Sequence, residues 1–331
     1  MPVVLITPEA MLHKQAPHVD MLKDAGFDIA YPRNPTFTRG HSSVEETIDE
    51  LSVCDGLMAG GEYISNTVLD SLPKLRVIAR FGVGYDRVDV AAATAHNVVL
   101  TITPTANHAA VAEHALMLLL AAAKRLPFND RSARAGEWPM QPTYPVRGTT
   151  VGIFGLGRIG RSFAVRVRAL GAKVIATETY PDETFVRENE IELVDFDTLL
   201  ARSDYISIHC PVNDDTRGRF DRAAFEKMKP SSVLVNTARG ALVVESDLID
   251  ALQSGHLRGA GLDCYEQEPP SSDNPLFRMI QVVCTPHCAG GDLQSQEDMG
   301  VESADCIIKL RAGEWPADAV VNSELRETWK W

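Results

Sequence analysis

The sequence predicts an α/β protein with two parallel sheets, each covered by helices on both faces. Strand-like and helix-like apolar segments alternate through about the first hundred residues, as they do when crossover helices connect parallel strands. A Gly-x-Gly-x-x-Gly turn at residues 155–160 follows another apolar strand near the middle of the chain, so a segment of domain size precedes it. With 331 residues, of which 45% are hydrophobic, the chain is large enough for two ordinary cores.

The first part of the chain supplies the elements of the first predicted sheet. Strands are expected at Val3–Ile6, Phe27–Ala30, Gly56–Ala59, Leu75–Arg80 and Val98–Thr101. Helices are expected between them at Met11–Ala25, which Gly26 would end, and at Val44–Leu51, Ser65–Leu72 and Asp89–Ala95. The polar stretch Asn34–Ser43 is expected to be a loop.

The chain is expected to cross into a second domain through a long helix. That helix covers about Ala106–Leu126, and a loop rich in Pro and Gly follows at Pro127–Gly148. Later, a helix at Asp298–Leu310 and an extended tail at Ala319–Asn322 are expected to return to the first domain. We therefore predict one domain of residues 1–104 and 291–331, with residues 105–290 inserted in it as the second.

The glycine turn is the strongest local sign of a ligand. In a dinucleotide-binding turn, Gly155 would allow the tight bend, Gly157 would let a pyrophosphate approach the backbone, and Gly160 would let the helix pack against strand Val151–Phe154. The helix that begins at Arg158 would direct its positive end at the phosphates. Because a turn of this pattern can also serve packing alone, its surroundings matter.

Glu178 is the most informative residue in those surroundings. It follows the strand Lys173–Thr177, about twenty residues beyond the turn, where an acid can accept a hydrogen bond from a ribose 2′-hydroxyl. The same carboxylate would repel a 2′-phosphate, so the pattern favours NAD over NADP as cofactor. An ordinary acid at a strand end is the alternative interpretation.

Polar residues also follow the other strands of the second domain. These strands are expected at Tyr205–Ile208, Ser232–Val235, Gly259–Leu262 and Gln281–Cys284. Ligands of an open α/β sheet bind beyond the carboxyl ends of its strands, and there the sequence places Arg239, Asp263, Glu268 and His287. We expect these four to converge with the glycine turn on one crevice. Each also has a structural interpretation: a surface arginine, a turn-forming acid, a solvated loop acid and a buried histidine.

Arg239, Glu268 and His287 together describe the chemistry of a 2-oxo acid and 2-hydroxy acid pair. Histidine can give or take the proton of the reacting oxygen near neutral pH. A neighbouring carboxylate would stabilise the protonated imidazole. Arginine would hold a substrate carboxylate through two parallel hydrogen bonds and polarise the adjacent carbonyl.

Composition narrows the class of partner. The formal net charge of −13 argues against nucleic acid and anionic membranes. The most apolar stretch, Ala115–Ala123, is too short to cross a bilayer, and Met1–Val4 leads into a strand without a signal peptide. Six scattered cysteines favour a reduced, cytoplasmic protein. Cys284, His287 and Cys288 lie close together but lack a second ligand pair with zinc spacing, so no metal is expected.

Six segments carry a resemblance to a known family. They are Phe81–Asp86, Val111–His114, Gly155–Gly160, Val235–Gly240, Leu262–Pro269 and Thr285–Gly290. In these segments, which are spread over nearly its whole length, the chain resembles the D-isomer-specific 2-hydroxyacid dehydrogenases. The resemblance implies a flavodoxin-like substrate domain and a Rossmann NAD-binding domain. It also implies a homodimer, for which the helix Ala106–Leu126 and the loop around Trp138 are the candidate contacts.

The resemblance further implies roles for individual residues. Arg239 would bind and polarise the substrate, His287 would be the acid/base, and Glu268 would pair with that histidine. The loop of Gly82, Val83 and Gly84 would hold the substrate carboxylate through its amides, and Asp263 would bond the nicotinamide carboxamide. The positions expected to contact the cofactor are Gly155, Gly157, Arg158, Ile159, Gly160, Glu178, Cys210, Pro211, Thr216, Thr237, Ala238, Asp263 and Gly290.

The substrate is expected to be a small unphosphorylated acid such as glyoxylate, hydroxypyruvate or pyruvate. The Phe81–Asp86 loop resembles the phosphoglycerate dehydrogenase branch, which typically places an arginine soon after the preceding strand. Here Gly60–Tyr63 occupies that region, and Glu62 would repel a phosphate, although Arg80 is a basic group near the loop. No long regulatory tail follows the core, which also favours this substrate. D-3-phosphoglycerate dehydrogenase is the alternative enzyme, and an NAD(H)-sensing corepressor-like scaffold is an alternative of another class.

Overall fold

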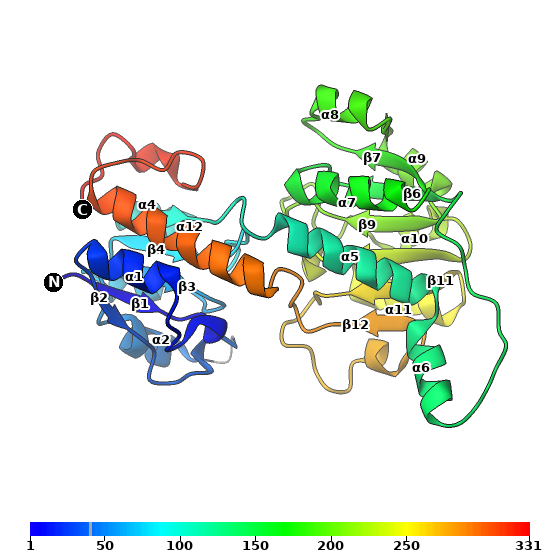
Figure 1. The fold of residues 1–331 in the computed structure, drawn as a ribbon, viewed down its shortest axis with the longest axis horizontal. Coiled ribbons are helices and arrows are strands. Elements are labelled where there is room, and N and C mark those ends of the chain that lie inside the picture. The colour runs from blue at the N-terminus through cyan, green and yellow to red at the C-terminus, as the bar shows by residue number, and fades with distance from the viewer. Residues whose placement is uncertain (40–41) are drawn as a thin grey trace. The chain divides into compact units, whose positions relative to one another are not determined.

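The computed structural model describes residues 1–39 and 42–331, which form two compact units. Unit 1 comprises Met1–Asn107 and Gly290–Trp331, and unit 2 comprises His108–Ala289 (Figure 1). Unit 2 is therefore inserted between two segments of unit 1. The sequence predicts the boundaries of the inserted domain after residues 104 and 290.

The strands of unit 1 form one parallel sheet in the described part of the chain. They are β1 (Val3–Ile6), β2 (Asp28–Ala30), β3 (Gly56–Ala59), β4 (Val77–Arg80) and β5 (Val99–Thr101). Their order is β2-β1-β3-β4-β5, and each neighbouring pair is parallel. This is the flavodoxin-like order, which confirms the fold predicted for the first domain.

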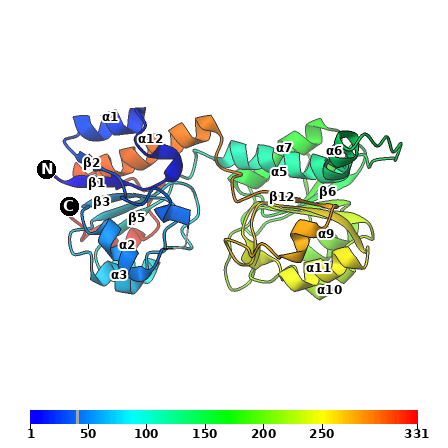
Figure 2. The ribbon, with the colours of Figure 1, turned by 90° about the horizontal axis from the view of Figure 1, so that it is seen from below.

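Helices cover both faces of the unit 1 sheet. They are α1 (Pro17–Asp24), α2 (Val44–Leu51), α3 (Asn66–Asp70), α4 (Val90–Ala95) and α12 (Leu293–Arg311), with 3₁₀ turns η1 (Glu9–Met11), η2 (Phe37–Arg39) and η5 (Ser323–Leu325). Figure 2 shows α1 and α12 on one face of the sheet and α2 and α3 on the other. Each face encloses its own buried apolar cluster.

Three expectations for unit 1 need correction. The helix predicted from Met11 begins only at Pro17, because proline lacks an N–H and is suited to the first helical turn. The last helix begins at Leu293 rather than Asp298, since the Asp292 side chain accepts a hydrogen bond from the Ser295 amide and caps it. The expected loop at residues 34–43 contains η2, with Phe37 buried, and its positions 40 and 41 lie outside the described residues.

Unit 2 contains a second parallel sheet. Its strands are β6 (Thr150–Phe154), β7 (Lys173–Thr177), β8 (Glu192–Leu193), β9 (Tyr205–Ile208), β10 (Ser232–Asn236), β11 (Leu257–Leu262) and β12 (Val282–Cys284). Their order is β12-β11-β10-β9-β6-β7-β8, so the direction of winding reverses between β6 and β9. This is a Rossmann order extended by one strand, as predicted, and ligands bind where the winding reverses.

Helices of unit 2 also lie on both faces of its sheet. They are α5 (His108–Ala123), α6 (Leu126–Arg134), α7 (Arg158–Ala169), α8 (Glu183–Glu188), α9 (Phe196–Arg202), α10 (Arg222–Lys227) and α11 (Glu245–Gln253), with 3₁₀ turns η3 (Gly240–Leu242) and η4 (Pro275–Arg278). Helices α5 and α7 cover one face, and α9, α10 and α11 cover the other (Figure 2). A Cβ on Gly261 would lie 2.7 Å from Cβ of Leu118, so glycine on β11 lets α5 pack closely.

The segment after α5 differs from the expectation. The helix predicted over Ala106–Leu126 ends at Ala123, and Arg125 has a left-handed φ of 53°. Part of the predicted loop Pro127–Gly148 is helix α6, because Pro127 stands in its first turn, where proline is tolerated. Short helices α8, α9 and α10, which the strand-centred prediction omitted, are capped by the side chains of Asp182, Asp195 and Asp221.

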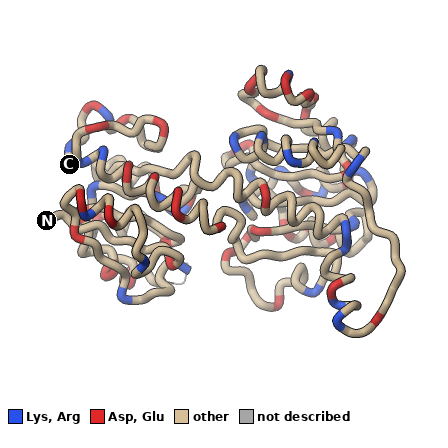
Figure 3. Tube along the Cα trace, viewed as in Figure 1, with Lys and Arg blue, Asp and Glu red and all other residues tan. Residues whose placement is uncertain are grey.

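Acidic and basic residues are dispersed over both units, and α7 carries several of the basic ones (Figure 3). Within the described residues, no helix combines the length and apolarity that a membrane span requires.

Candidate active site

The glycine turn joins β6 to α7 at the point where the winding of the unit 2 sheet reverses. Gly155 has φ of 98°, and a Cβ there would lie 2.7 Å from the Cys210 amide nitrogen, so this position requires glycine. A Cβ on Gly160 would meet the Gly155 carbonyl oxygen. By contrast, a Cβ on Gly157 would meet nothing within 4 Å, so the backbone here borders open space that a ligand can fill.

Helix α7 presents its N-terminus to that space. The amide of Arg161 is the first to donate within the helix, to the Gly157 carbonyl. Arg161, Arg166 and Arg168 form ion pairs with the acids Asp182, Glu113 and Glu190. Among the described residues, Arg158 is then the arginine of α7 for which no such pair is recorded, and it stands in the first turn. These features suit a bound pyrophosphate.

Glu178 contacts the turn directly. Its Oε2 accepts a hydrogen bond from the Leu156 amide at 2.6 Å, and its Oε1 accepts one from the Tyr180 amide at 3.0 Å. The carboxylate is therefore held at the rim of the turn, and Glu178 is more than an isolated acid at the end of β7.

The residues after β9 and β10 border the same turn. Cys210 packs against Gly155, and burial raises the pKa of its thiol to about 12. The hydroxyl of Thr216 donates to the Pro211 carbonyl at 2.8 Å, which closes the loop that follows. Oγ1 of Thr237 is buried without a hydrogen-bond partner among the described residues, so this hydroxyl is available to bond a ligand.

Arg239 is presented by a short turn after β10. Asn236 shapes this turn, because its side chain accepts from the Ala238 amide at 3.0 Å and donates to the Arg239 carbonyl at 2.8 Å. Gly240 then lies against the Tyr265 carbonyl, where a Cβ would overlap the backbone. The turn that carries Arg239 therefore abuts the segment that leads to Glu268, and the charges of both residues act on the buried thiol of Cys264.

His287 and Glu268 form the most clearly built pair of the site. Nδ1 of His287 lies 2.7 Å from Oε2 of Glu268, and Oε1 of Glu268 accepts from the Tyr265 amide at 3.1 Å. The imidazole is 45% exposed, whereas the carboxylate is 18% exposed. Glu268 is thus held by the Tyr265 amide, and the imidazole that pairs with it remains partly exposed.

Asp263 directly follows β11, and it is buried. Its Oδ1 accepts from the Thr285 hydroxyl at 2.6 Å and from the Cys288 amide at 2.9 Å, and its Oδ2 accepts from the Ala289 amide at 2.9 Å. This carboxylate therefore holds the loop that carries His287. The contact with the nicotinamide that the resemblance implies stays a prediction.

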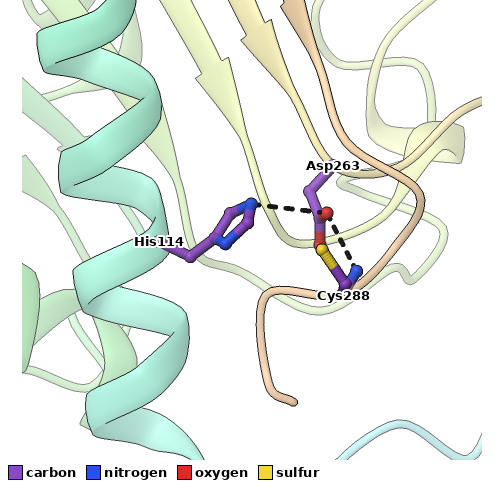
Figure 4. Close-up of side chains that lie close together, drawn as sticks. All are labelled: His114, Asp263 and Cys288. Atoms are coloured by element: carbon purple, nitrogen blue, oxygen red, sulfur yellow. Dashed lines mark hydrogen bonds and ion pairs between the residues drawn. The ribbon is translucent and has the colours of Figure 1, made fainter. Parts of the chain in front are cut away.

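A cluster of His114, Asp263 and Cys288 has side chains of the types that bind metals, with ligand atoms within 4.8 Å of one another (Figure 4). Figure 4 shows the imidazole reaching from α5 toward the carboxylate. Burial and the Asp263 carboxylate raise the pKa of the Cys288 thiol, which disfavours the thiolate that a metal requires. Since Asp263 already accepts three hydrogen bonds, we describe the cluster as a hydrogen-bond network.

The predicted substrate loop belongs to unit 1. Gly82 has φ of 132°, and its amide donates to the Thr103 hydroxyl at 3.0 Å. Arg80 lies below the loop, nearly buried, and donates to the carbonyls of Gly84 (3.0 Å) and Gly60.

Glu62, which we expected to face a substrate phosphate, points into unit 1. Its Oε1 accepts from the Thr7 hydroxyl at 2.6 Å, and burial raises the pKa of its carboxyl. Repulsion by Glu62 is therefore the wrong reason to exclude a phosphate.

The structure gathers the predicted residues in two sets. Those from the glycine turn to His287 lie in unit 2, at the ends of neighbouring strands, while Gly82–Gly84 and Gly290 lie in unit 1. Gly290 packs against the Asn107 side chain, where a Cβ would lie 2.8 Å from Nδ2. The sequence assigned no role to three further residues of the site, which are His114, Asn236 and Thr285. They lie in segments that carry the family resemblance, but their hydrogen-bond partners are known only from the structure.

Comparison with known families gives a match over residues 116–289. The matching sequence family is described as "D-isomer specific 2-hydroxyacid dehydrogenase, NAD binding domain". The matched residues include the glycine turn, Glu178, Arg239, Glu268 and His287.

Similar proteins are found among curated sequences and solved structures. The chain is 44% identical over 266 residues to D-3-phosphoglycerate dehydrogenase of Mycobacterium leprae, which covers 80% of this chain and 50% of that protein. It is 36% identical over 285 residues to glyoxylate reductase of Korarchaeum cryptofilum, covering 84% and 86%. The structure of the TT0316 protein from Thermus thermophilus matches with a TM-score of 0.84 at 30% identity, over 96% of this chain and all of that one. The chain thus spans about half the length of the phosphoglycerate dehydrogenase that it matches.

Proposed function

The chain belongs to the D-isomer specific 2-hydroxyacid dehydrogenase family and carries its NAD binding domain, and we propose that it transfers hydride between NAD(H) and a small, unphosphorylated 2-oxo or 2-hydroxy acid. The observation that carries the proposal is the pair of His287 and Glu268, 2.7 Å apart, at the edge of the sheet that holds the glycine turn. This pair supports the proposal because an imidazole paired with a fixed carboxylate is suited to donating a proton to a carbonyl oxygen.

The residues divide the work between binding and proton transfer. When bound, NADH supplies the hydride for carbonyl reduction. Arg239 binds the substrate carboxylate and polarises its carbonyl, because a guanidinium offers two parallel donors. With Nδ1 committed to Glu268, His287 delivers its proton from Nε2 to the carbonyl oxygen, and the carboxylate stabilises the imidazolium before transfer.

The substrate preference rests on the basic groups of unit 1. The two arginines nearest the Gly82–Gly84 loop donate to the backbone: Arg80 to the carbonyls of Gly60 and Gly84, and Arg87 to that of Gly61. Arg87 also lies over the ring of Tyr63, 4.7 Å from its centroid. Both guanidinium groups thus have partners within unit 1, which supports a substrate without a phosphate.

D-3-phosphoglycerate dehydrogenase is the second candidate, favoured by the names of the relatives at 38–44% identity. It would require one of these arginines to exchange a carbonyl for a phosphate. A competition between hydroxypyruvate and 3-phosphohydroxypyruvate, followed through NADH oxidation, separates the two: we expect kcat/KM to favour hydroxypyruvate at least tenfold, and the reverse preference would select the phosphorylated acid.

The activity itself is tested by a panel of 2-oxo acids assayed with NADH and with NADPH. We expect turnover with NADH and a preference over NADPH of about 100-fold, because Glu178 would face a 2′-phosphate. The variants Arg239→Ala and His287→Ala should lose at least about 100-fold in kcat/KM and still bind NADH. Arg278→Ala, an exposed arginine of η4, is the matched control. If no acid is turned over although NADH binds, the scaffold alternative is favoured.

We also propose that the protein is a homodimer. Trp138 and Met140, which follow α6, are 83% and 88% exposed, as expected of side chains that a partner subunit would cover. Sedimentation equilibrium of the protein and of a Trp138→Ser, Met140→Ser variant tests this proposal. We expect the parent protein to be a dimer and the variant to have a higher dimer dissociation constant. A monomeric parent protein would contradict the proposal.

A further inference from the structure

Three residues from separate elements form a hydrogen-bonded chain beneath the His287 loop. His114 comes from α5, Thr285 follows β12, and Asp263 follows β11. Nε2 of His114 lies 2.9 Å from Oγ1 of Thr285, and that hydroxyl lies 2.6 Å from Oδ1 of Asp263. Nε2 of His114 is itself 3.5 Å from Oδ1 of Asp263, the approach drawn in Figure 4.

The positions of the protons in the hydrogen bonds between His114, Thr285 and Asp263 follow from the donors that these side chains offer. A carboxylate only accepts, so the short contact with Asp263 uses the single hydroxyl proton of Thr285. The Thr285 oxygen must then accept from His114, which places a proton on Nε2 of that imidazole. The competing acceptor for Thr285, the Leu262 carbonyl, is farther away at 3.3 Å. His114 therefore fixes the direction in which the threonine donates.

The loop that this chain braces is strained at the proposed acid/base. His287 has φ of 52°, a left-handed conformation that is unfavourable for residues other than glycine. Such a conformation persists only where the surroundings determine it. Asp263 holds the residues on both sides: Thr285 before His287, and the amides of Cys288 and Ala289 after it.

We infer that His114 is a positioning residue: through Thr285 and Asp263 it holds the backbone around His287 in the conformation that pairs this imidazole with Glu268. Helix α5 is suited to this task because it packs closely on β11 at Gly261 and so provides a rigid support. The kinetic consequence rests on the proposed function, whereas the effect on the loop does not.

The variants His114→Ala and His114→Gln test the inference together. Alanine removes the donor, and glutamine can place an amide N–H close to the position of Nε2. We expect His114→Ala to lower kcat about tenfold, roughly the loss of one hydrogen bond to the network, with less than a twofold change in the KM for NADH. His114→Gln should restore most of kcat. Met117→Ala, an exposed residue of the same helix, is the control that should leave kcat unchanged.

A measurement independent of activity distinguishes this inference from the proposed function. Hydrogen–deuterium exchange of a peptide spanning residues 285–290 should be faster in His114→Ala, and in Thr285→Val, than in the parent protein, while the double variant should exchange no faster than Thr285→Val. The β6 strand should keep its protection, which shows that unit 2 is folded.

Several outcomes would overturn the inference. They are an unchanged exchange rate at residues 285–290, a failure of glutamine to recover kcat, or a KM effect without a kcat effect. Loss of kcat on treatment with a chelator, with recovery on adding Zn²⁺, would instead assign His114, Asp263 and Cys288 to a metal. If no 2-oxo acid is reduced but the exchange pattern holds, the positioning role stands and the proposed activity fails.

Discussion

Nδ1 of His287 and Oε2 of Glu268 lie 2.7 Å apart, and the second carboxylate oxygen of Glu268 is fixed by the Tyr265 amide. Gly240 lets the turn that carries Arg239 lie directly against the backbone of Tyr265. Because the Tyr265 amide holds Glu268, this contact connects the proposed substrate-binding arginine with the partner of His287. The spatial relation of these residues is therefore set by packing between β10 and β11.

Replacing Glu268 with Gln removes the negative charge of the side chain but nearly keeps its size and shape. Glutamine can still accept from the Tyr265 amide, but it does not stabilise a protonated imidazole, so kcat for reduction should fall by about 10²-fold while NADH binding is unchanged. Steady-state kinetics and NADH fluorescence titration measure the two quantities. Glu266→Gln, an exposed acid two residues away, should behave like the parent protein. Equal losses in both variants would remove Glu268 from the mechanism.

Two glycines of the turn should affect different properties: Gly157 the binding of NADH, and Gly155 the stability of the fold. In Gly157→Ala the added Cβ enters open space, so the melting temperature should not change, but the NADH Kd should rise at least about tenfold because a pyrophosphate needs that space. In Gly155→Ala the Cβ collides with Cys210 at a φ of 98°, so stability should fall by roughly 1–3 kcal/mol or more. Calorimetry and NADH titration of both variants provide the check. Unchanged NADH affinity in Gly157→Ala would place the cofactor elsewhere.

His209 should make unit 2 less stable at acid pH. Burial lowers the pKa of this imidazole from 6.5 to about 3, so between these values the unfolded chain binds a proton that the folded protein does not. The stability that His209 contributes is thus present above about pH 6.5 and is lost as the pH falls. Urea unfolding measures the free energy of unfolding at pH 7 and at pH 5. Between these values it should fall by about 2 kcal/mol more in the parent protein than in His209→Gln. Parallel losses in the two proteins would show that this histidine is not the group that titrates.

Asn322 should anchor the C-terminal segment to unit 1. Its Oδ1 accepts from the Leu100 amide at 2.9 Å, and its Nδ2 donates to the Val98 carbonyl at 2.9 Å, although it lies outside the regular elements. Asn322→Ala leaves buried backbone groups unpaired and should cost about 1–3 kcal/mol of stability. Chemical denaturation measures the loss, with the exposed Ser323→Ala as control. A cost no greater than that of the control would mean that the tail contributes little.

The apolar strands and the glycine turn were predictable because their signals are local. Alternation of strand and helix patterns led to two parallel sheets, and the polar residues after the strands of unit 2 do lie at its carboxyl edge. Helix ends were less predictable. Pro17 falls inside the predicted helix Met11–Ala25, and Pro127 begins the predicted loop Pro127–Gly148, whereas each stands in a first helical turn.

The roles of single polar residues depended most on tertiary structure. Glu62 was expected to face a substrate, and its burial beside Thr7 could not be anticipated from a Gly-Gly-Glu sequence. His114 lies 171 positions from Thr285, and no spacing rule connects a helix to a strand end at that separation.

By itself, the sequence determined the fold class, the position of the glycine turn and the types of residue that carry the proposed chemistry, because periodicity and strand-end placement act over a few residues. Only the tertiary structure decided that the Tyr265 amide fixes Glu268, that Asp263 accepts hydrogen bonds from the amides after His287 and that Arg80 donates to the Gly84 carbonyl. These relations depend on which strands become neighbours and how closely helices approach them. Both are set by packing between segments far apart in the chain.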